Sequence, residues 1–133
     1  MSDPIAFIDL AAQRKRIGSA MDEAILRVVN HGGYIMGPEV KTLEADLSAF
    51  CGAKHSISCA NGTDALAMVL MAKGVKAGDA VLCPSFTFAA TAEVVAWVGA
   101  TPIFVDVRED TFNLDVAGLE AGLKTARSLN LNP

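Results

Sequence analysis

The chain has 133 residues, a formal net charge of −4 and 52% hydrophobic residues. This length fits one domain with a real core, and the acidic balance excludes the basic stripe that nucleic-acid binding requires. The high apolar content predicts surface that a partner or further polypeptide covers.

Two features argue against secretion and against a membrane. The first ten residues, MSDPIAFIDL, lack the basic flank and continuous apolar core of a signal peptide. Residues 80–105 carry only one charge, Glu93, but Pro84, Gly99 and Pro102 divide them into pieces too short to span a bilayer. A buried strand, helix and strand fit this stretch better.

The cysteines predict neither a disulfide framework nor a zinc site. Cys51, Cys59 and Cys83 are odd in number and share no C-x-x-C spacing. We expect Cys59 and Cys83 to be buried small residues rather than nucleophiles. Without a secretion signal, the expected location is the reducing cytoplasm.

Hydrophobic spacing and turn residues predict the elements in order. The prediction is a helix over 10–30, a glycine-rich loop, a helix over 38–52, a strand over 55–60, a helix over 63–74, a strand over 78–85, a helix over 87–99, a strand over 101–107 and a helix over 113–129 capped by Asp115. This order predicts an α/β fold, with a parallel-strand βαβαβ core preceded by two helices. The expected parts are residues 1–52, the helices and an active-site loop, and residues 53–133, the βαβαβα part.

The stretch SCANGTDALAMVL has the pattern of an anion site. Its Asn61-Gly62-Thr63-Asp64 turn falls at the carboxyl end of a predicted strand and opens a helix, where unpaired N–H groups favour anions. Gly62 allows close approach, the Thr63 hydroxyl adds a donor, and Asp64 is expected to cap the helix. An Asx turn with a helix cap and no ligand explains the same pattern.

A second candidate lies in CPSFTFAAT, after the next strand. Phe86 and Phe88 flank Thr87, so one ring can lie flat against a planar ligand, while a core position is expected for Phe86. Asp106, at the end of the third strand, either reaches the same face or bonds a backbone amide.

Several familiar sites are excluded. The sequence contains no G-x-x-x-x-G-K-[ST] loop, and Gly32, Gly33 and Gly37 follow a helix and do not form G-x-G-x-x-G. His31 and His55 have no metal-ligand spacing, so solvent-facing roles and no metal site are expected.

Taken together, the segments FIDL, GGYIMGPEV, LEADLSAFCGAKHSISCANGTDAL, GDAVLCPSFTFAATAEVVAWVGATPIFVDV and TFNLD resemble the DegT/DnrJ/EryC1/StrS family. Its members are pyridoxal-phosphate-dependent nucleotide-sugar aminotransferases of fold type I. The resemblance implies that this chain is the N-terminal part of the large domain. Within the family it is most similar to enzymes that aminate a 3-keto UDP-N-acetylhexuronic acid for surface polysaccharide.

The resemblance assigns roles to residues. Gly62, Thr63 and Asp64 would bind the phosphate of pyridoxal 5'-phosphate, and Phe88 would stack on its ring. The loop from Tyr34 to Gly37 would lie near an active site at a homodimer interface. The implied reaction is a ping-pong transamination from an amino donor, usually glutamate, to a keto nucleotide sugar, without nucleic acid or membrane partners.

That chemistry needs a Schiff-base lysine and a carboxylate on the pyridinium nitrogen. In the family both come later in the sequence than Pro133, and none of the lysines here is placed to replace the first. We therefore expect a truncated chain that is inactive alone. A non-catalytic module that binds a phosphorylated ligand or oligomerises through its sheet edge is the alternative.

Overall fold

The computed structural model describes residue 5 and residues 7–133, so part of the stretch that argues against a signal peptide lies outside the described residues. Contacts group the chain into two compact units, one ending at Ser58 and one spanning Cys59–Pro133. The expected boundary after residue 52 stays a prediction, because these units are defined by contacts and a domain is defined by independent folding.

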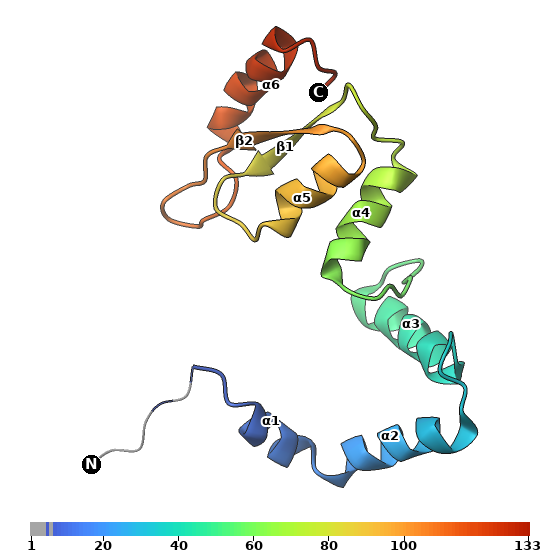
Figure 1. Cartoon of the computed structure of the whole chain (residues 1–133). Helices are drawn as coiled ribbons and strands as arrows, with labels where there is room; N and C mark the ends of the chain where they lie inside the picture. The colour runs from blue at the N-terminus through green and yellow to red at the C-terminus, as the bar shows by residue number, and fades with distance from the viewer. Residues whose placement is uncertain (1–4, 6) are drawn as a thin grey trace. The chain divides into compact units, whose positions relative to one another are not determined.

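The first unit consists of helices (Figure 1). They are α1 (Leu10–Ile17), α2 (Ser19–His31) and α3 (Pro38–Cys51). No residue of these three helices is fully buried, so their apolar stripes are exposed within the described chain.

The single helix predicted over 10–30 is wrong, because Gly18 divides it. Gly18 has a φ of 70°, a conformation that glycine adopts at little cost and that no helix contains. Its N–H still donates to the Arg14 carbonyl at 3.1 Å. The Arg14 guanidinium in turn donates to the Gly18 carbonyl at 2.6 Å and pairs with Asp22. These contacts close the gap between α1 and α2.

The strand predicted over 55–60 is also not formed. The segment is extended and alternates as a strand does, with Ser56 and Ser58 half-buried and Ile57 77% exposed. Side chains of α3 hold it instead of a backbone ladder, since Ser56 bonds Ser48 at 3.0 Å and the Ser58 N–H donates to Glu44 at 2.8 Å. A strand needs a neighbouring strand for its N–H and C=O groups, and the described chain places none beside this segment.

The second unit alternates helices and strands. Its elements are α4 (Gly62–Ala72), β1 (Ala80–Pro84), α5 (Ala90–Trp97), β2 (Thr101–Val105), the 3-10 turn η1 (Val116–Gly118) and α6 (Leu119–Ser128). The two strands pair in parallel from Ala80 opposite Thr101 to Pro84 opposite Val105, as predicted. Asp115 caps η1 by accepting from the Ala117 N–H at 3.0 Å, and α6 begins only after that turn. None of the helices in the described part of the chain has the length and apolar character needed to cross a bilayer.

Helices cover both faces of the two-stranded sheet (Figure 1). On one face Val81 and Cys83 of β1 pack against α4 and α5. On the other face Ala80 and Ile103 pack against Ala126 of α6. This burial on both faces explains why the strands read as continuous apolar runs.

A close approach fixes α6 on the sheet. A Cβ added at Gly122 would lie 2.9 Å from Val105 Cγ2 and 3.1 Å from Leu82 Cδ2. The missing side chain therefore lets the helix backbone lie directly against the sheet.

The outer edge of β1 carries a short parallel bridge from Asp79 to Asn132. The Ala80 N–H donates to the Asn132 carbonyl at 2.7 Å, and the Asn132 side chain donates to Asp79 at 2.9 Å. This side-chain bond lowers the pKa of Asp79 below its ordinary value. The chain at Asn132 therefore runs parallel to the start of β1, on the edge that β2 leaves free.

Candidate functional site

The turn that opens α4 is fixed by Asn61. Asn61 has extended backbone, and its side-chain oxygen accepts from the Asp64 N–H at 2.9 Å. Its side-chain amide donates to the Asp64 carboxylate at 3.1 Å. The expectation that Asp64 caps the helix is therefore wrong, because Asn61 occupies the position from which a side chain reaches the first-turn N–H groups.

Gly62 and Thr63 are the first two residues of α4. Their N–H groups and the Thr63 hydroxyl form no hydrogen bond within the described chain. A Cβ built at Gly62 meets nothing within 4 Å, so the chain's own packing does not require glycine there.

This donor set fits a phosphate group. Two N–H groups and a hydroxyl lie in the first turn of the helix, at the positive end of its dipole, where anions are stabilised. The open space over Gly62 leaves room for phosphate oxygens to reach those N–H groups. The third amide, that of Asp64, is already used by Asn61.

The start of α4 lies at the carboxyl edge of the sheet. The chain runs along α4 toward the start of β1, returns along β1, and enters α5 where β1 ends. Both helices therefore begin at the edge of the sheet where β1 ends (Figure 1). Leu66 of α4 and Thr91 of α5, each near the start of its helix, line one apolar pocket of about 190 Å³ over Cys83. Ligands bind at this edge in open α/β sheets.

The loop between β1 and α5 presents aromatic rings at the same edge. Phe88 is 79% exposed, which leaves its ring available to a planar ligand. Phe86 is 67% exposed, so the expectation of a core position is wrong. Because β1 ends at Pro84, Phe86 lies in the loop and not in the sheet. Its ring packs on Phe112 at a centroid distance of 5.4 Å.

Asp106 bonds a backbone amide, which is one of the two roles considered from the sequence. Its Oδ1 accepts from the Val107 N–H at 2.8 Å and from the Ser85 hydroxyl at 3.1 Å. It therefore bonds a backbone amide and also links the carboxyl ends of the two strands.

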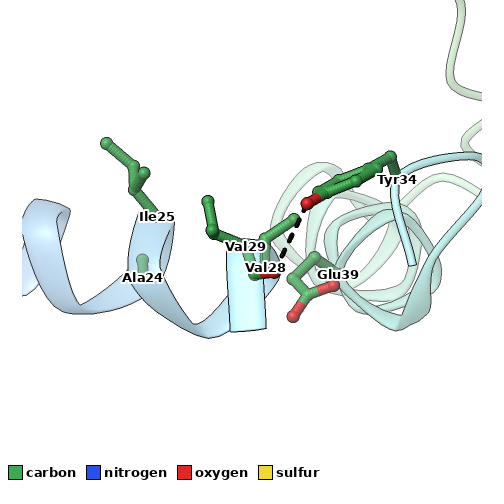
Figure 2. A pocket seen from close by; sticks show the side chains of 6 residues that line it. All are labelled: Ala24, Ile25, Val28, Val29, Tyr34 and Glu39. Atoms are coloured by element: carbon green, nitrogen blue, oxygen red, sulfur yellow. Dashed lines mark hydrogen bonds between the residues drawn. The ribbon is translucent and has the colours of Figure 1, made fainter. Parts of the chain in front are cut away.

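The glycine-rich loop belongs to the first unit and forms its own hollow. Tyr34 lines an open apolar hollow of about 450 Å³ beside α2, and its hydroxyl donates to the Val29 carbonyl at 3.3 Å (Figure 2). Gly37 is required by a close contact, since a Cβ there would lie 2.1 Å from the Gly33 carbonyl oxygen. Met36 has a φ of 50°, which is unusual for a residue with a side chain.

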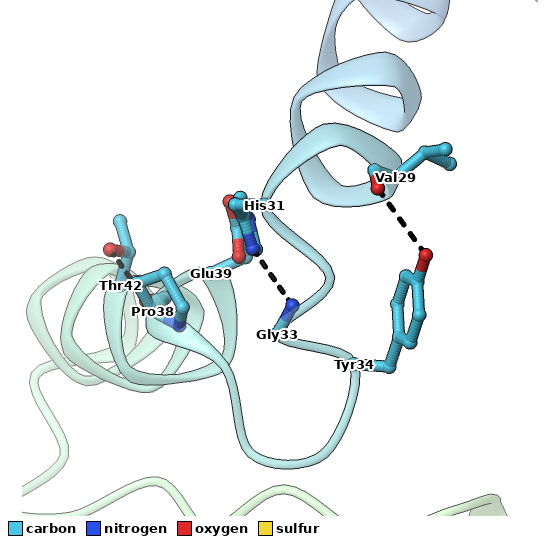
Figure 3. A network of polar contacts seen from close by, with 7 residues as sticks. All are labelled: Val29, His31, Gly33, Tyr34, Pro38, Glu39 and Thr42. Carbon is cyan, nitrogen blue, oxygen red and sulfur yellow. Dashed lines mark hydrogen bonds and ion pairs between the residues drawn. The ribbon is translucent and has the colours of Figure 1, made fainter.

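A polar network holds the ends of this loop (Figure 3). His31 Nδ1 accepts from the Gly33 N–H at 3.0 Å, which leaves Nε2 to donate to Glu39 at 3.0 Å. The bond from His31 lowers the pKa of the Glu39 carboxyl. Both ring nitrogens of His31 therefore form hydrogen bonds that hold the loop between α2 and α3.

The cysteines divide into two kinds. Cys83 is buried, and burial raises the pKa of its thiol, so it is a core residue as expected. Cys59 is exposed, and its thiol donates to the Asn61 carbonyl at 3.2 Å, so the expectation of burial is wrong there.

The sequence placed Asn61 in the turn and allowed an Asx turn with a helix cap, but assigned the cap to Asp64, although asparagine is a preferred N-cap. No pattern pointed to Phe112, because its contact with Phe86 joins two loops far apart in the sequence.

Comparison with known proteins identifies relatives along nearly the whole chain. A UDP-2-acetamido-2-deoxy-3-oxo-D-glucuronate aminotransferase of Pseudomonas aeruginosa is 56% identical over 119 residues, which is 90% of this chain and 33% of that protein. The chain therefore spans about a third of the length of the curated relatives it matches.

Solved structures agree. A DegT DnrJ EryC1 StrS aminotransferase from Brucella abortus matches with a TM-score of 0.93 and 53% identity, over 98% of this chain and 35% of that one. The PLP-form of the sugar aminotransferase Spr1654 from Streptococcus pneumoniae matches with a TM-score of 0.70 and 34% identity, over 74% of this chain and 25% of that one. These neighbours confirm the α/β fold class, as the N-terminal part of an aminotransferase fold.

The family profile itself extends over most of the sequence and confirms the resemblance seen in the motifs. It matches residues 15–129, which include the turn at Gly62, the loop at Phe88 and the loop at Tyr34. The chain belongs to the DegT/DnrJ/EryC1/StrS aminotransferase family.

Proposed function

We propose that this chain forms the phosphate- and ring-binding part of a pyridoxal-phosphate-dependent aminotransferase that acts on a keto nucleotide sugar. The observation that carries the proposal is the pair of unpartnered N–H groups at Gly62 and Thr63, at the carboxyl edge of the sheet. Family membership and the PLP-form of a related structure support the choice of cofactor.

The cofactor's phosphate would lie at the start of α4. The N–H groups of Gly62 and Thr63 and the Thr63 hydroxyl would donate to its oxygens, with the helix dipole adding attraction. The Asp64 carboxylate accepts a hydrogen bond from the Asn61 side-chain amide at 3.1 Å. In this proposal Asp64 stabilises the turn through that bond and does not contact the phosphate directly. Asp64 thus acts on the site through Asn61.

The cofactor's ring would lie against Phe88. An exposed aromatic ring offers a flat apolar face, and stacked rings gain about 0.5–1.5 kcal/mol beyond the area they bury. When bound, pyridoxal phosphate supplies the aldehyde and the electron sink that amino-group transfer requires. Phe88 would contribute orientation and would exclude water from one face of the ring.

We also propose that no lysine of the second unit forms the covalent bond to the cofactor. Lys73 and Lys76 follow the end of α4, at the edge where β1 begins, which is the edge opposite Gly62. Lys124 lies on the outer face of α6 and pairs with Glu120 at 2.9 Å. We also propose that the chain alone is inactive in transamination, with the lysine that bonds the cofactor supplied from outside the second unit.

The substrate and donor follow from the relatives. The Pseudomonas protein is named for a UDP-linked 3-oxo sugar acid, which supports a keto UDP-sugar as substrate. A Bacillus subtilis relative named as a spore coat polysaccharide biosynthesis protein supports a role in surface polysaccharide. An amino acid, glutamate in our proposal, would supply the amino group. The cysteines are free thiols, which fits a cytoplasmic location.

Binding of pyridoxal phosphate to the chain tests the proposal. We expect the fluorescence of Trp97, the single tryptophan, to fall as pyridoxal phosphate is added to the wild-type protein. Thr63→Val should weaken the affinity for pyridoxal phosphate by about 1–3 kcal/mol, because one donor is lost. Thr125→Val is the matched control, because the Thr125 hydroxyl bonds the Ala121 carbonyl on α6, remote from the turn.

Three outcomes would contradict parts of it. Equal affinities of wild-type and Thr63→Val protein would reduce Thr63 to a helix-start residue without a ligand. Reduction with borohydride that leaves a stable adduct on any lysine of the second unit would overturn the assignment of the lysines. Equal affinity for inorganic phosphate and for pyridoxal phosphate would favour a phosphate-binding module without a role for Phe88.

A further inference from the structure

The loop that carries Phe88 is tied to the next strand by a hydrogen-bond clasp. The Ser85 hydroxyl donates to Asp106 Oδ1 at 3.1 Å, and the same oxygen accepts from the Val107 N–H at 2.8 Å. The Asp106 carbonyl accepts from the Asp115 N–H at 2.8 Å. Asp106 therefore joins three segments: the start of the Phe88 loop, the end of β2 and the turn before η1.

A second tie reaches the same loop from the side. Phe86 packs on Phe112 with a ring-to-ring angle of 42°. Phe112 has a φ of 56°, a costly conformation for an aromatic residue. It is held there by its N–H, which donates to the Arg108 carbonyl at 2.9 Å. Such conformations persist where the surrounding structure imposes them.

Phe88 itself has little to fix its direction. Its side chain is 79% exposed, so core packing does not select one orientation. On the α5 side, the Phe88 carbonyl accepts from the Thr91 N–H at 3.0 Å, and the Thr87 and Thr91 hydroxyls bond at 2.9 Å. On the other side, the direction of the Phe88 ring depends on how firmly residues 85 and 86 are held.

We propose that Ser85, Asp106 and Phe112 are positioning residues that set the direction of Phe88. The hydrogen-bond clasp holds the first residue of the loop, and the ring pair holds the second. The part of this inference that concerns ligand binding rests on the proposed function, because it takes Phe88 to meet the cofactor's ring. The part that concerns the loop's order does not.

The test uses Ser85→Ala, Asp106→Asn and Phe112→Leu, with Ser128→Ala as control. Ser85→Ala removes only the bond across the strands, whereas Asp106→Asn keeps an accepting oxygen and should behave as wild type. Ser128 donates its hydroxyl to the Thr125 carbonyl on α6, so its loss should change neither readout. Circular dichroism checks that each variant folds.

Two readouts separate the inference from the proposed function. The amides of Ser85 and Thr91 donate to the Val105 carbonyl at 2.9 Å and to the Phe88 carbonyl at 3.0 Å, at the two ends of the loop. Their hydrogen exchange should be about fivefold faster in Ser85→Ala and in Phe112→Leu, as expected for one lost hydrogen bond or equivalent contact. The dissociation constant for pyridoxal phosphate should rise by a similar factor, while the thermal midpoint changes little.

Unchanged exchange in both Ser85→Ala and Phe112→Leu would overturn the positioning role. Faster exchange with an unchanged dissociation constant would overturn its link to the ligand. If wild-type protein binds no pyridoxal phosphate and exchange still rises in both variants, the loop's tethering stands while the proposed function fails.

Discussion

At the residue scale, the candidate site depends on which polar groups the chain uses for itself. Asn61 uses both ends of its side-chain amide on Asp64, and Ala65 donates its N–H to the Asn61 carbonyl at 3.1 Å. These bonds satisfy the third and fourth amides of α4. Among the described residues, the two amides without a partner in the turn are those of Gly62 and Thr63, which we propose for the phosphate.

A pH-dependent contact at this scale lies in the Tyr34 loop. The bond from His31 holds the pKa of Glu39 below its ordinary value of 4.5. Because the folded pKa is depressed, the carboxylate's stabilising contribution is fully present above about 4.5 and is lost as pH falls through the folded pKa. Arg27 adds a smaller lowering by its charge.

We expect His31→Ala to raise the pKa of Glu39 toward 4.5, since the first-ranked cause of the depression is removed. His31→Gln, which can still donate a hydrogen bond, should keep part of the depression. A titration of the Glu39 side-chain carboxyl by NMR measures this. The same midpoint in wild type and His31→Ala would show that the contact does not form.

At the element scale, glycine decides where helices break and how closely they pack. Gly18 ends α1 with positive φ, and Gly122 allows α6 to lie on Leu82 and Val105. Gly62 is different, because a side chain there would meet open space. The same residue type thus serves a turn, a packing contact and an exposed helix start.

We predict different effects on stability for two glycine-to-alanine changes. Gly122→Ala should lower the free energy of unfolding by about 1–3 kcal/mol, because its Cβ would contact Val105, which is 4% exposed and stiff at χ1. Gly62→Ala should leave stability equal or slightly higher, since alanine favours the helix. Urea unfolding monitored by circular dichroism measures both. Equal destabilisation by the two changes would refute the packing argument.

These elements also show what the sequence can and cannot reveal. The apolar runs around β1 and β2 predicted parallel strands correctly, because burial on both faces is a local pattern. The strand over 55–60 was wrong, since pairing depends on a neighbour that no local pattern specifies. Within the site, the family motifs indicated Gly62, Thr63 and Phe88. The exposure of Phe86 and its contact with Phe112 depend on loop geometry instead.

At the scale of the whole molecule, the described chain leaves much apolar surface uncovered. In the first unit Ile25 and Leu47 are 54% and 43% exposed on amphipathic helices, and in the second unit Trp97 is 62% exposed. Large exposed apolar patches mark sites where protein partners bind. We propose a homodimer, with the Tyr34 loop near the shared active site.

We expect the purified chain to self-associate as its concentration rises. Analytical ultracentrifugation should show a shift from monomer to dimer, and Leu47→Glu should weaken it because a charge would enter the apolar surface. Glu93→Gln, a change at an exposed polar position of α5, is the control. A monomer at all concentrations would contradict the homodimer proposal while leaving the cofactor site untouched.

The most direct test of the cofactor proposal follows the backbone amides of Gly62 and Thr63 by ¹⁵N NMR during addition of pyridoxal phosphate. We predict large shifts for these two amides, with the Asp64 amide less affected because Asn61 already holds it. Shifts confined to other residues, or no shifts at saturating cofactor, would contradict the claim that this turn binds the phosphate.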